Sequence, residues 1–213
     1  MTILRTPPRG RRAALAVAVV LAVGGARGGD PGARFVPDGK ARGDRPSREG
    51  VYEAERAGCS IDLVLLGDAE RAAFLKRAGV ARDPFAPAPG FPSGFVVFRV
   101  RVANRGNGDV VFQPQAARLE FGKHDVRSPV AWTDVVEAYG VLGAEPPPEY
   151  VAARSAIFDG EVVLPPGARA EGLLPFRRLP AETRRFRAAV GATTGSGESV
   201  AVEAAYRRAD GRP

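Results

Sequence analysis

The chain has almost none of the residues that build disulfides or sites for soft metal ions. Its 213 residues include one cysteine, Cys59, and one histidine, His124. A single cysteine excludes an intramolecular disulfide, so packing alone must hold the core together. Zinc and copper sites made of histidine and cysteine need several such ligands close together. We therefore expect neither a cofactor nor a metal in this protein.

Lysine is scarce as well, because only three of the 31 basic residues are lysine. The net charge of the chain is +7, but four arginines precede residue 13 and no acid lies in residues 1–26. Without that segment the net charge is +3. A charge so small and so spread out argues against a nucleic-acid partner.

The N-terminal segment, residues 1–26, has the pattern of a secretory signal peptide. A basic stretch precedes the apolar run AALAVAVVLAV, residues 13–23, which is too short to span a bilayer. Gly24 and Ala26 supply the small side chains that cleavage after Ala26 needs. The basic stretch ends in two adjacent arginines, but the residues around them match the twin-arginine export signal poorly. We therefore expect export by the general secretory route. The alternative is an uncleaved short anchor, and either route predicts a periplasmic or extracellular location.

Composition divides the rest of the chain into two parts. Residues 27–50 contain few apolar residues and many Gly, Pro, Arg and Asp, which predicts a flexible tether. Residues 51–210 carry regular apolar patterns and form the predicted folded domain. No membrane span is expected in the mature chain.

The stretch FVVFRVRVAN, residues 95–104, shows the clearest alternation in the sequence. One face of the predicted strand is wholly apolar, at Val96, Phe98, Val100 and Val102. The other face carries Arg99 and Arg101 beside Phe95 and Val97, which is typical of a sheet with one buried and one solvated side. The next residues, NRGNGD, tolerate positive φ and predict a hairpin turn before VVFQP.

Other segments repeat this pattern around brief helices. Alternation in CSIDLVLL predicts a strand that buries Cys59 as a small apolar side chain, with an intermolecular disulfide as the alternative. Residues 68–79 change to a helical period, and residues 128–143 predict one or two further helical turns. Residues 185–208 read as a last hairpin whose apolar face is Val200, Val202, Ala204 and Tyr206.

These segments predict an all-β fold, an antiparallel sandwich of seven to nine strands with one or two short helical insertions. FRVRVANRG, followed by VVLPPGARAEGLLPF, resembles the bacterial extracytoplasmic immunoglobulin-like domains of unknown role, and more loosely the cell-adhesion-related repeats. The resemblance covers about residues 95–176 and rests on an Asn-x-Gly strand end and a Leu-x-Pro-Gly turn. It implies an immunoglobulin-like fold and supplies no catalytic or ligand-binding residue.

The sequence gives little sign of residues that could act together as a catalytic site. HDVRS, residues 124–128, places histidine, aspartate and serine together, but neighbours on one extended loop seldom converge as nucleophile, base and orienter. No Gly-x-Ser-x-Gly elbow occurs. A small extracytoplasmic hydrolase that uses His124 with Cys59 or Ser128 is therefore the alternative hypothesis to a protein without enzymatic activity.

One basic cluster stands out in RRLPAETRRFR, where a single acid interrupts five arginines. They form a predicted anion-facing patch: Arg177, Arg178, Arg184, Arg185 and Arg187. Such a patch suits lipid headgroups, an acidic glycan or an acidic protein, although a solvated loop between strands would also look this way. The sequence thus predicts a non-enzymatic binding or scaffold module of the cell envelope that contacts a protein or glycan through loops or a sheet face. It leaves the oligomeric state open.

Overall fold

The computed structural model of the chain describes residues 34–39, 44, 46–47, 50–86, 94–134, 137, 145 and 148–209. The predicted signal peptide, residues 1–26, lies outside the described residues and stays a prediction. Among the helices of the described part, none is both long and apolar enough to cross a bilayer.

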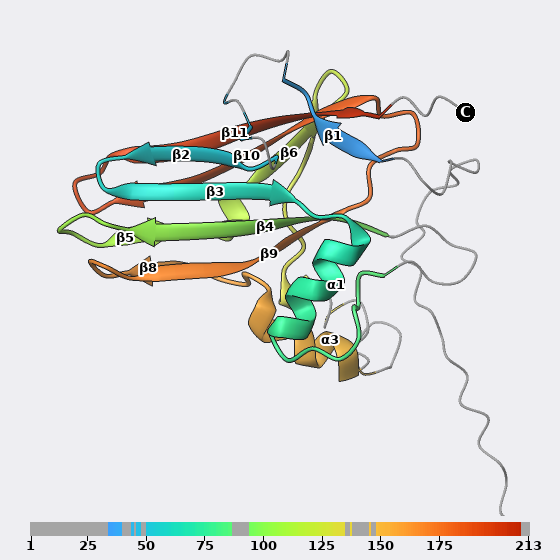
Figure 1. The fold of residues 1–213 in the computed structure, drawn as a ribbon, viewed down its shortest axis with the longest axis horizontal. Coiled ribbons are helices and arrows are strands. Elements are labelled where there is room, and N and C mark those ends of the chain that lie inside the picture. Colours follow the sequence, from blue (N-terminus) through green and yellow to red (C-terminus); the bar gives the residue numbers. More distant parts are fainter. Residues whose placement is uncertain are drawn as a thin grey trace, which may run out of the picture.

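Two antiparallel sheets form the fold, which confirms the all-β prediction (Figure 1). The four-stranded sheet has the order β2-β3-β4-β9, with the strands Tyr52–Arg56, Cys59–Leu65, Phe95–Asn104 and Arg169–Arg177. The seven-stranded sheet has the order β1-β11-β10-β5-β8, and β6 pairs with both β10 and β7. Its strands are β1 Phe35–Pro37, β5 Val110–Phe112, β6 Arg118–Phe121, β7 Asp125–Arg127, β8 Val162–Leu164, β10 Arg185–Thr194 and β11 Ser199–Arg208.

The described residues thus hold eleven strands, more than the seven to nine predicted from the sequence. Four of them, β1, β5, β7 and β8, are three residues long. So short a segment offers too few positions for an alternating pattern to be recognised. The helical elements are also short: α1 Asp68–Arg77, α3 Pro148–Ala153 and the 3₁₀ turns Pro114–Ala116 and Arg154–Ala156.

The space between the two sheets holds the main core. Phe98, Val100 and Val102 of β4 are completely buried there, as the alternation in the sequence predicts. Aromatic rings from both sheets meet around Tyr206, whose ring centroid lies 5.5 Å from Tyr52, 5.7 Å from Phe98 and 5.0 Å from Phe186. Large buried rings contribute much of the hydrophobic stabilisation of a small domain, so this cluster joins the sheets firmly.

The connection from β4 to β5 is not the hairpin that the sequence predicts. β4 pairs with β3 and β9, whereas β5 pairs with β10 and β8 in the other sheet. Both edges of β4 are occupied, so the chain cannot fold back beside it and crosses to the opposite sheet instead. The predicted last hairpin is correct, because β10 and β11 pair along their length and bury its predicted apolar face.

A strand also lies within residues 27–50, the segment predicted to be a tether. Phe35, Val36 and Pro37 of β1 pair with the end of β11, and the Phe35 ring packs edge-on against Phe186 at 4.9 Å. The two adjacent apolar side chains of β1 bury enough surface to hold this short strand. The average composition of residues 27–50 does not reveal them.

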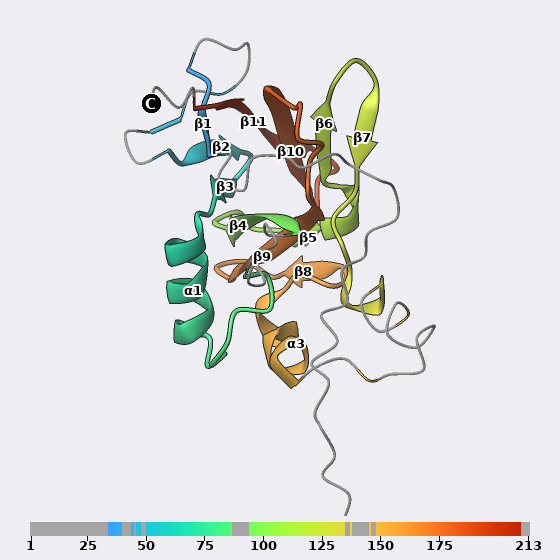
Figure 2. The same cartoon turned by 90° about the vertical axis from the view of Figure 1, so that its right-hand side faces the viewer.

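A second, smaller core covers part of the outer face of the four-stranded sheet (Figure 2). Leu75 of α1 and Phe85 pack there with Val97 of β4 and Leu173 of β9. Helix α1 begins where Glu70 accepts a hydrogen bond from the Gly67 N–H at 2.9 Å, close to the predicted start. We call the outward positions Val64, Phe95, Val97, Leu173 and Pro175 the covered half of this face.

Nine further outward positions of the same strands are not part of the second core. They are Glu53, Glu55, Ser60, Asp62, Arg99, Arg101, Ala103, Arg169 and Glu171, which we call the open half. Arg99 and Arg101 thus lie on the solvated side of β4, with side chains 28% and 46% exposed. The sequence pattern of β4 predicts this correctly.

Candidate functional site

The five arginines of the predicted anion-facing patch surround the loop that joins β9 to β10. Arg177 ends β9 and Arg178 follows it, while Arg184 precedes β10 and both Arg185 and Arg187 lie on that strand. Four of the five are exposed, and Arg178 is half-buried. The fold therefore places them at one end of the sandwich.

Most of this patch has no acid within ion-pair distance. Arg185 is the exception, because its Nε atom lies 3.4 Å from Oδ2 of the buried Asp38. In the described part of the chain, no carboxylate lies within 4.0 Å of the guanidinium groups of Arg177, Arg178, Arg184 and Arg187. No ion pair in the described part of the chain neutralises these four groups, although Glu120 of β6 lies opposite Arg187 of β10.

Arg127 belongs to the same surface, although the sequence does not indicate it. Its Nη1 atom donates hydrogen bonds to the carbonyl oxygens of Arg177 and Arg178, and its guanidinium lies over the Phe121 ring at 4.9 Å. Burial and the nearby charge of Arg177 lower the pKa of Arg127. A residue from the β6–β7 hairpin thus holds the start of the β9–β10 loop in place.

The groups of the alternative hydrolase hypothesis are not arranged as a catalytic pair. The Cys59 side chain is completely buried in the main core, and burial raises the pKa of its thiol. His124 and Ser128 are exposed at the two ends of β7. Among the described contacts, no hydrogen bond joins His124 to Ser128 or to Cys59. Cys59 is the small buried strand residue that the sequence predicts.

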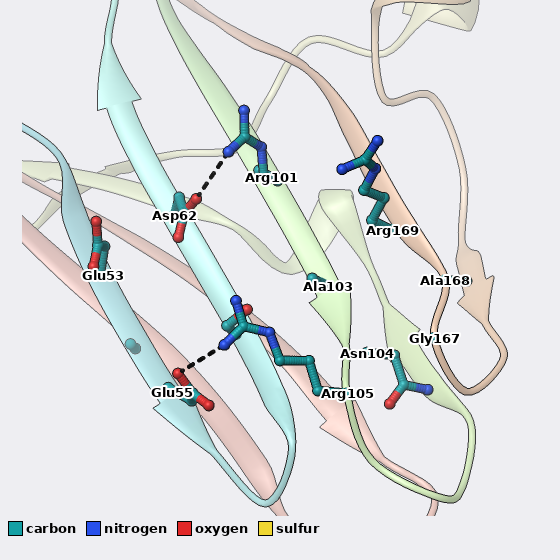
Figure 3. Close-up of a pocket in the computed structure, with 12 residues that line it drawn as sticks. Glu53, Glu55, Asp62, Arg101, Ala103, Asn104, Arg105, Gly167, Ala168 and Arg169 are labelled. Atoms are coloured by element: carbon teal, nitrogen blue, oxygen red, sulfur yellow. Dashed lines mark ion pairs between the residues drawn. The ribbon is translucent and has the colours of Figure 1, made fainter.

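A hollow of about 690 Å³ lies on the open half of the four-stranded sheet (Figure 3). Its floor is low because Ser60 of β3 lies opposite Ala103 of β4, and both side chains are small. The hollow is lined by Glu53, Ala54, Glu55, Ser60, Asp62, Arg101, Ala103, Asn104, Arg105, Gly167, Ala168 and Arg169.

Three ion pairs cross this surface, and Figure 3 marks two of them, Arg101 with Asp62 and Arg105 with Glu55. Nη1 of Arg101 lies 3.7 Å from Oδ2 of Asp62, and its Nη2 lies 3.3 Å from Oε1 of Glu171. Nη1 of Arg105 lies 3.5 Å from Oε2 of Glu55 on β2. The carboxylates of this surface are thus concentrated on β2 and β3, and its guanidinium groups come from β4, β9 and the turn after β4.

Two further charged groups of the hollow have no ion-pair partner among the described residues. They are Glu53 on β2 and Arg169 on β9, at opposite edges of the sheet. The Ser60 hydroxyl in the floor likewise has no hydrogen-bond partner in the described part of the chain. The hollow can therefore offer a carboxylate, a hydroxyl and a guanidinium to a ligand.

Asn104 holds the rim of the hollow. Its side-chain Nδ2 donates to the carbonyl oxygens of Gly108 at 2.7 Å and Leu164 at 2.8 Å, and its Oδ1 accepts from the Gly106 N–H at 2.9 Å. Because Asn104 is 1% exposed, these bonds satisfy a buried amide completely on both sides. The Asn-x-Gly and Leu-x-Pro-Gly motifs of the sequence therefore meet through one side chain.

Neighbouring turns pack closely against this rim (Figure 1). Gly58, at φ 75°, approaches Gly106 so closely that a Cβ atom on Gly58 would lie 2.6 Å from the Gly106 backbone. The Arg105 N–H donates to the Gly58 carbonyl at 2.6 Å. The hollow is thus bounded by a rigid cluster of turns, which suits a binding site that must keep its shape.

Comparisons with known proteins add no functional information. No protein-family model and no curated protein sequence matches the chain. Among solved structures, it is similar to the yjhA protein from Bacillus subtilis, with a TM-score of 0.35 and 12% identity over 65% of this chain and 76% of that one. It is also similar to a Bordetella pertussis protein assigned as ApaA, with a TM-score of 0.31 and 15% identity over 73% of this chain and 94% of that one. Similarities this low support no conclusion about function.

Proposed function

We propose that this chain is a non-enzymatic, immunoglobulin-like binding module of the cell envelope, exported by its N-terminal segment. Its partner is a protein segment that carries both positive and negative charges, and this segment lies in the hollow on the four-stranded sheet. The observation that carries the proposal is the hollow itself, in which Glu53 and Arg169 lack partners across a floor of small side chains.

The chemistry of the hollow favours a protein segment over a glycan. None of the residues that line it is aromatic, so the site offers no flat ring against which a sugar could stack. A uniformly acidic glycan would meet the carboxylates of Glu53, Glu55 and Asp62 along one side. A peptide with charges of both signs can satisfy both sides at once.

The existing ion pairs do not block such a partner. The side chains of Arg105 and Glu55 are 68% and 60% exposed, and pairs so exposed contribute about 1 kcal/mol or less to stability. Charged groups of a ligand can replace them at little cost. The same lining contains no histidine or cysteine, so it does not supply the pair on which the alternative hydrolase hypothesis rests.

An array of immobilised octapeptides, sorted by charge and probed with the whole chain, tests this proposal. We expect peptides that contain both lysine and aspartate to retain the protein better than all-basic, all-acidic or neutral peptides. The double substitution Glu53→Gln with Arg169→Ser should weaken that retention about tenfold, since it removes two charged contacts.

The matched control is Arg118→Ser with Glu120→Gln, which removes one exposed arginine and one exposed acid from β6, outside the hollow. Retention of the control should equal that of the unchanged protein. Equal losses in both double variants, or no preference for mixed charge, would contradict the proposal. If the chain instead binds an acidic glycan array, and this binding depends on Arg169, then the partner is a glycan and not a peptide.

A further inference from the structure

Charge is distributed unevenly over a sandwich that is neutral as a whole. Residues 51–210 contain 20 Lys and Arg and 20 Asp and Glu. The net charge of +7 therefore comes from outside this range, yet one end of the sandwich is strongly basic. We define the arginine end as residues 34–39, 120–127, 177–187 and 206–209.

These four segments lie together in the fold. β1 pairs with the end of β11, the start of β10 pairs with both β11 and β6, and Arg127 bonds to the backbone of Arg177. The arginine end contains four acids, Asp38, Glu120, Asp125 and Glu182. It contains ten basic residues: Arg34, Lys123, Arg127, Arg177, Arg178, Arg184, Arg185, Arg187, Arg207 and Arg208.

An exposed apolar side chain lies in the same surface. Val126 is 54% exposed, one of three large hydrophobic residues in the described part of the chain that are so accessible. It lies on the β6–β7 hairpin next to Arg127, and Lys123 lies in the turn of that hairpin. Asp125 and Arg127 flank Val126 in the chain, and Glu120 lies opposite it on β6. An exposed apolar side chain close to cations can touch the boundary between lipid headgroups and acyl chains.

The N-terminal part of the chain enters the described structure at this end. Arg34 immediately precedes β1, and its carbonyl accepts a hydrogen bond from the Ala209 N–H at 2.7 Å. If the apolar segment of residues 13–23 is retained as an anchor, it therefore joins the sandwich at the arginine end.

We propose that the arginine end docks on the surface of an anionic phospholipid bilayer. Positive charges come from four separate segments at one end of the sandwich, and so wide a distribution suits a plane of phosphates better than a single bound anion. Val126 adds contact below the headgroups. This inference goes beyond the proposed function and does not depend on it, since no residue of the arginine end lines the hollow.

Co-sedimentation of the whole chain with vesicles tests the inference. We expect tighter binding to phosphatidylcholine vesicles that contain 30% phosphatidylglycerol than to pure phosphatidylcholine, and less of this difference at high salt. Each cation near such a surface changes partitioning by roughly fivefold, so Arg177→Ser, Arg184→Ser and Arg187→Ser together should weaken binding about 100-fold.

The matched control replaces Arg56, Arg82 and Arg118 with serine, which removes three exposed arginines from outside the arginine end. Its binding should change only a few-fold, and circular dichroism should show that both triple variants fold. Equal losses in the two triple variants, or no dependence on phosphatidylglycerol, would overturn the inference. So would binding to an acidic polysaccharide that depends on the same arginines while vesicles are not bound.

Discussion

The covered half and the open half of the four-stranded sheet share the same strands but are stabilised in different ways. In the covered half, Val97 and Leu173 are buried beneath Leu75 and Phe85, so removal of apolar surface from water holds this region. In the open half, partly exposed charged side chains pair across the strands at 3.3 to 3.7 Å. The comparison teaches that one sheet face can be held by apolar burial in one half and by cross-strand charge pairs in the other.

The largest expected effect follows from removal of apolar contacts in the covered half. Leu173→Ala should lower the free energy of unfolding by about 2 to 5 kcal/mol, because Leu173 is completely buried in the second core. Urea denaturation followed by circular dichroism measures this change. The control is Glu171→Ala, two residues earlier on the same face, which should cost less than about 1 kcal/mol because its ion pairs are screened by solvent. Similar costs for the two variants would remove the distinction between the halves.

A smaller effect is expected where turns support the open half. Asn104→Ala should lower the free energy of unfolding by about 1 to 3 kcal/mol, because it leaves the carbonyls of Gly108 and Leu164 without their donor. Asn104→Asp should cost more, since it places carboxylate oxygens beside two carbonyl oxygens. The same urea titration gives the order of the two variants, and the reverse order would show that Asn104 does not act through these donors.

The smallest effect concerns the charges of the open half. Arg101→Gln should change the free energy of unfolding by no more than about 1 kcal/mol, because the Arg101 side chain is 46% exposed. Its loss leaves Glu53, Asp62 and Glu171 in one row across the strands, so the cost should shrink as salt screens their repulsion. Thermal unfolding at 20 mM and 500 mM NaCl tests this dependence. A cost that salt does not alter would mean that Arg101 contributes through packing.

Much of the fold could be predicted from local patterns. The alternation in β4 identifies the side chains that face the main core, and the helical period of residues 68–79 identifies α1. The second core is harder to predict, because Phe95 and Val97 on the outer face of β4 do not reveal what covers them. The crossing between sheets after β4 depends on which strands occupy its edges, and these strands are distant in sequence.

The candidate sites differ in how far the sequence reveals them. The five arginines around the β9–β10 loop are close in sequence, so their cluster is visible without a structure. Arg127 reaches them from fifty residues away, and nothing in its local sequence indicates this contact. The hollow depends on Ser60 lying opposite Ala103, a register that only the paired strands determine. Surfaces assembled from distant strands are therefore the part that single-sequence reasoning misses.

The pairing of β1 with β11 also determines how the sandwich responds to mechanical force. Arg34 and Ala209 lie side by side at the open end of this antiparallel pair. A force that pulls Arg34 and Ala209 apart would break the hydrogen bonds between β1 and β11 one at a time. It would not load all of these hydrogen bonds together in shear. The first strand therefore resists such a load weakly, because its three residues carry few hydrogen bonds.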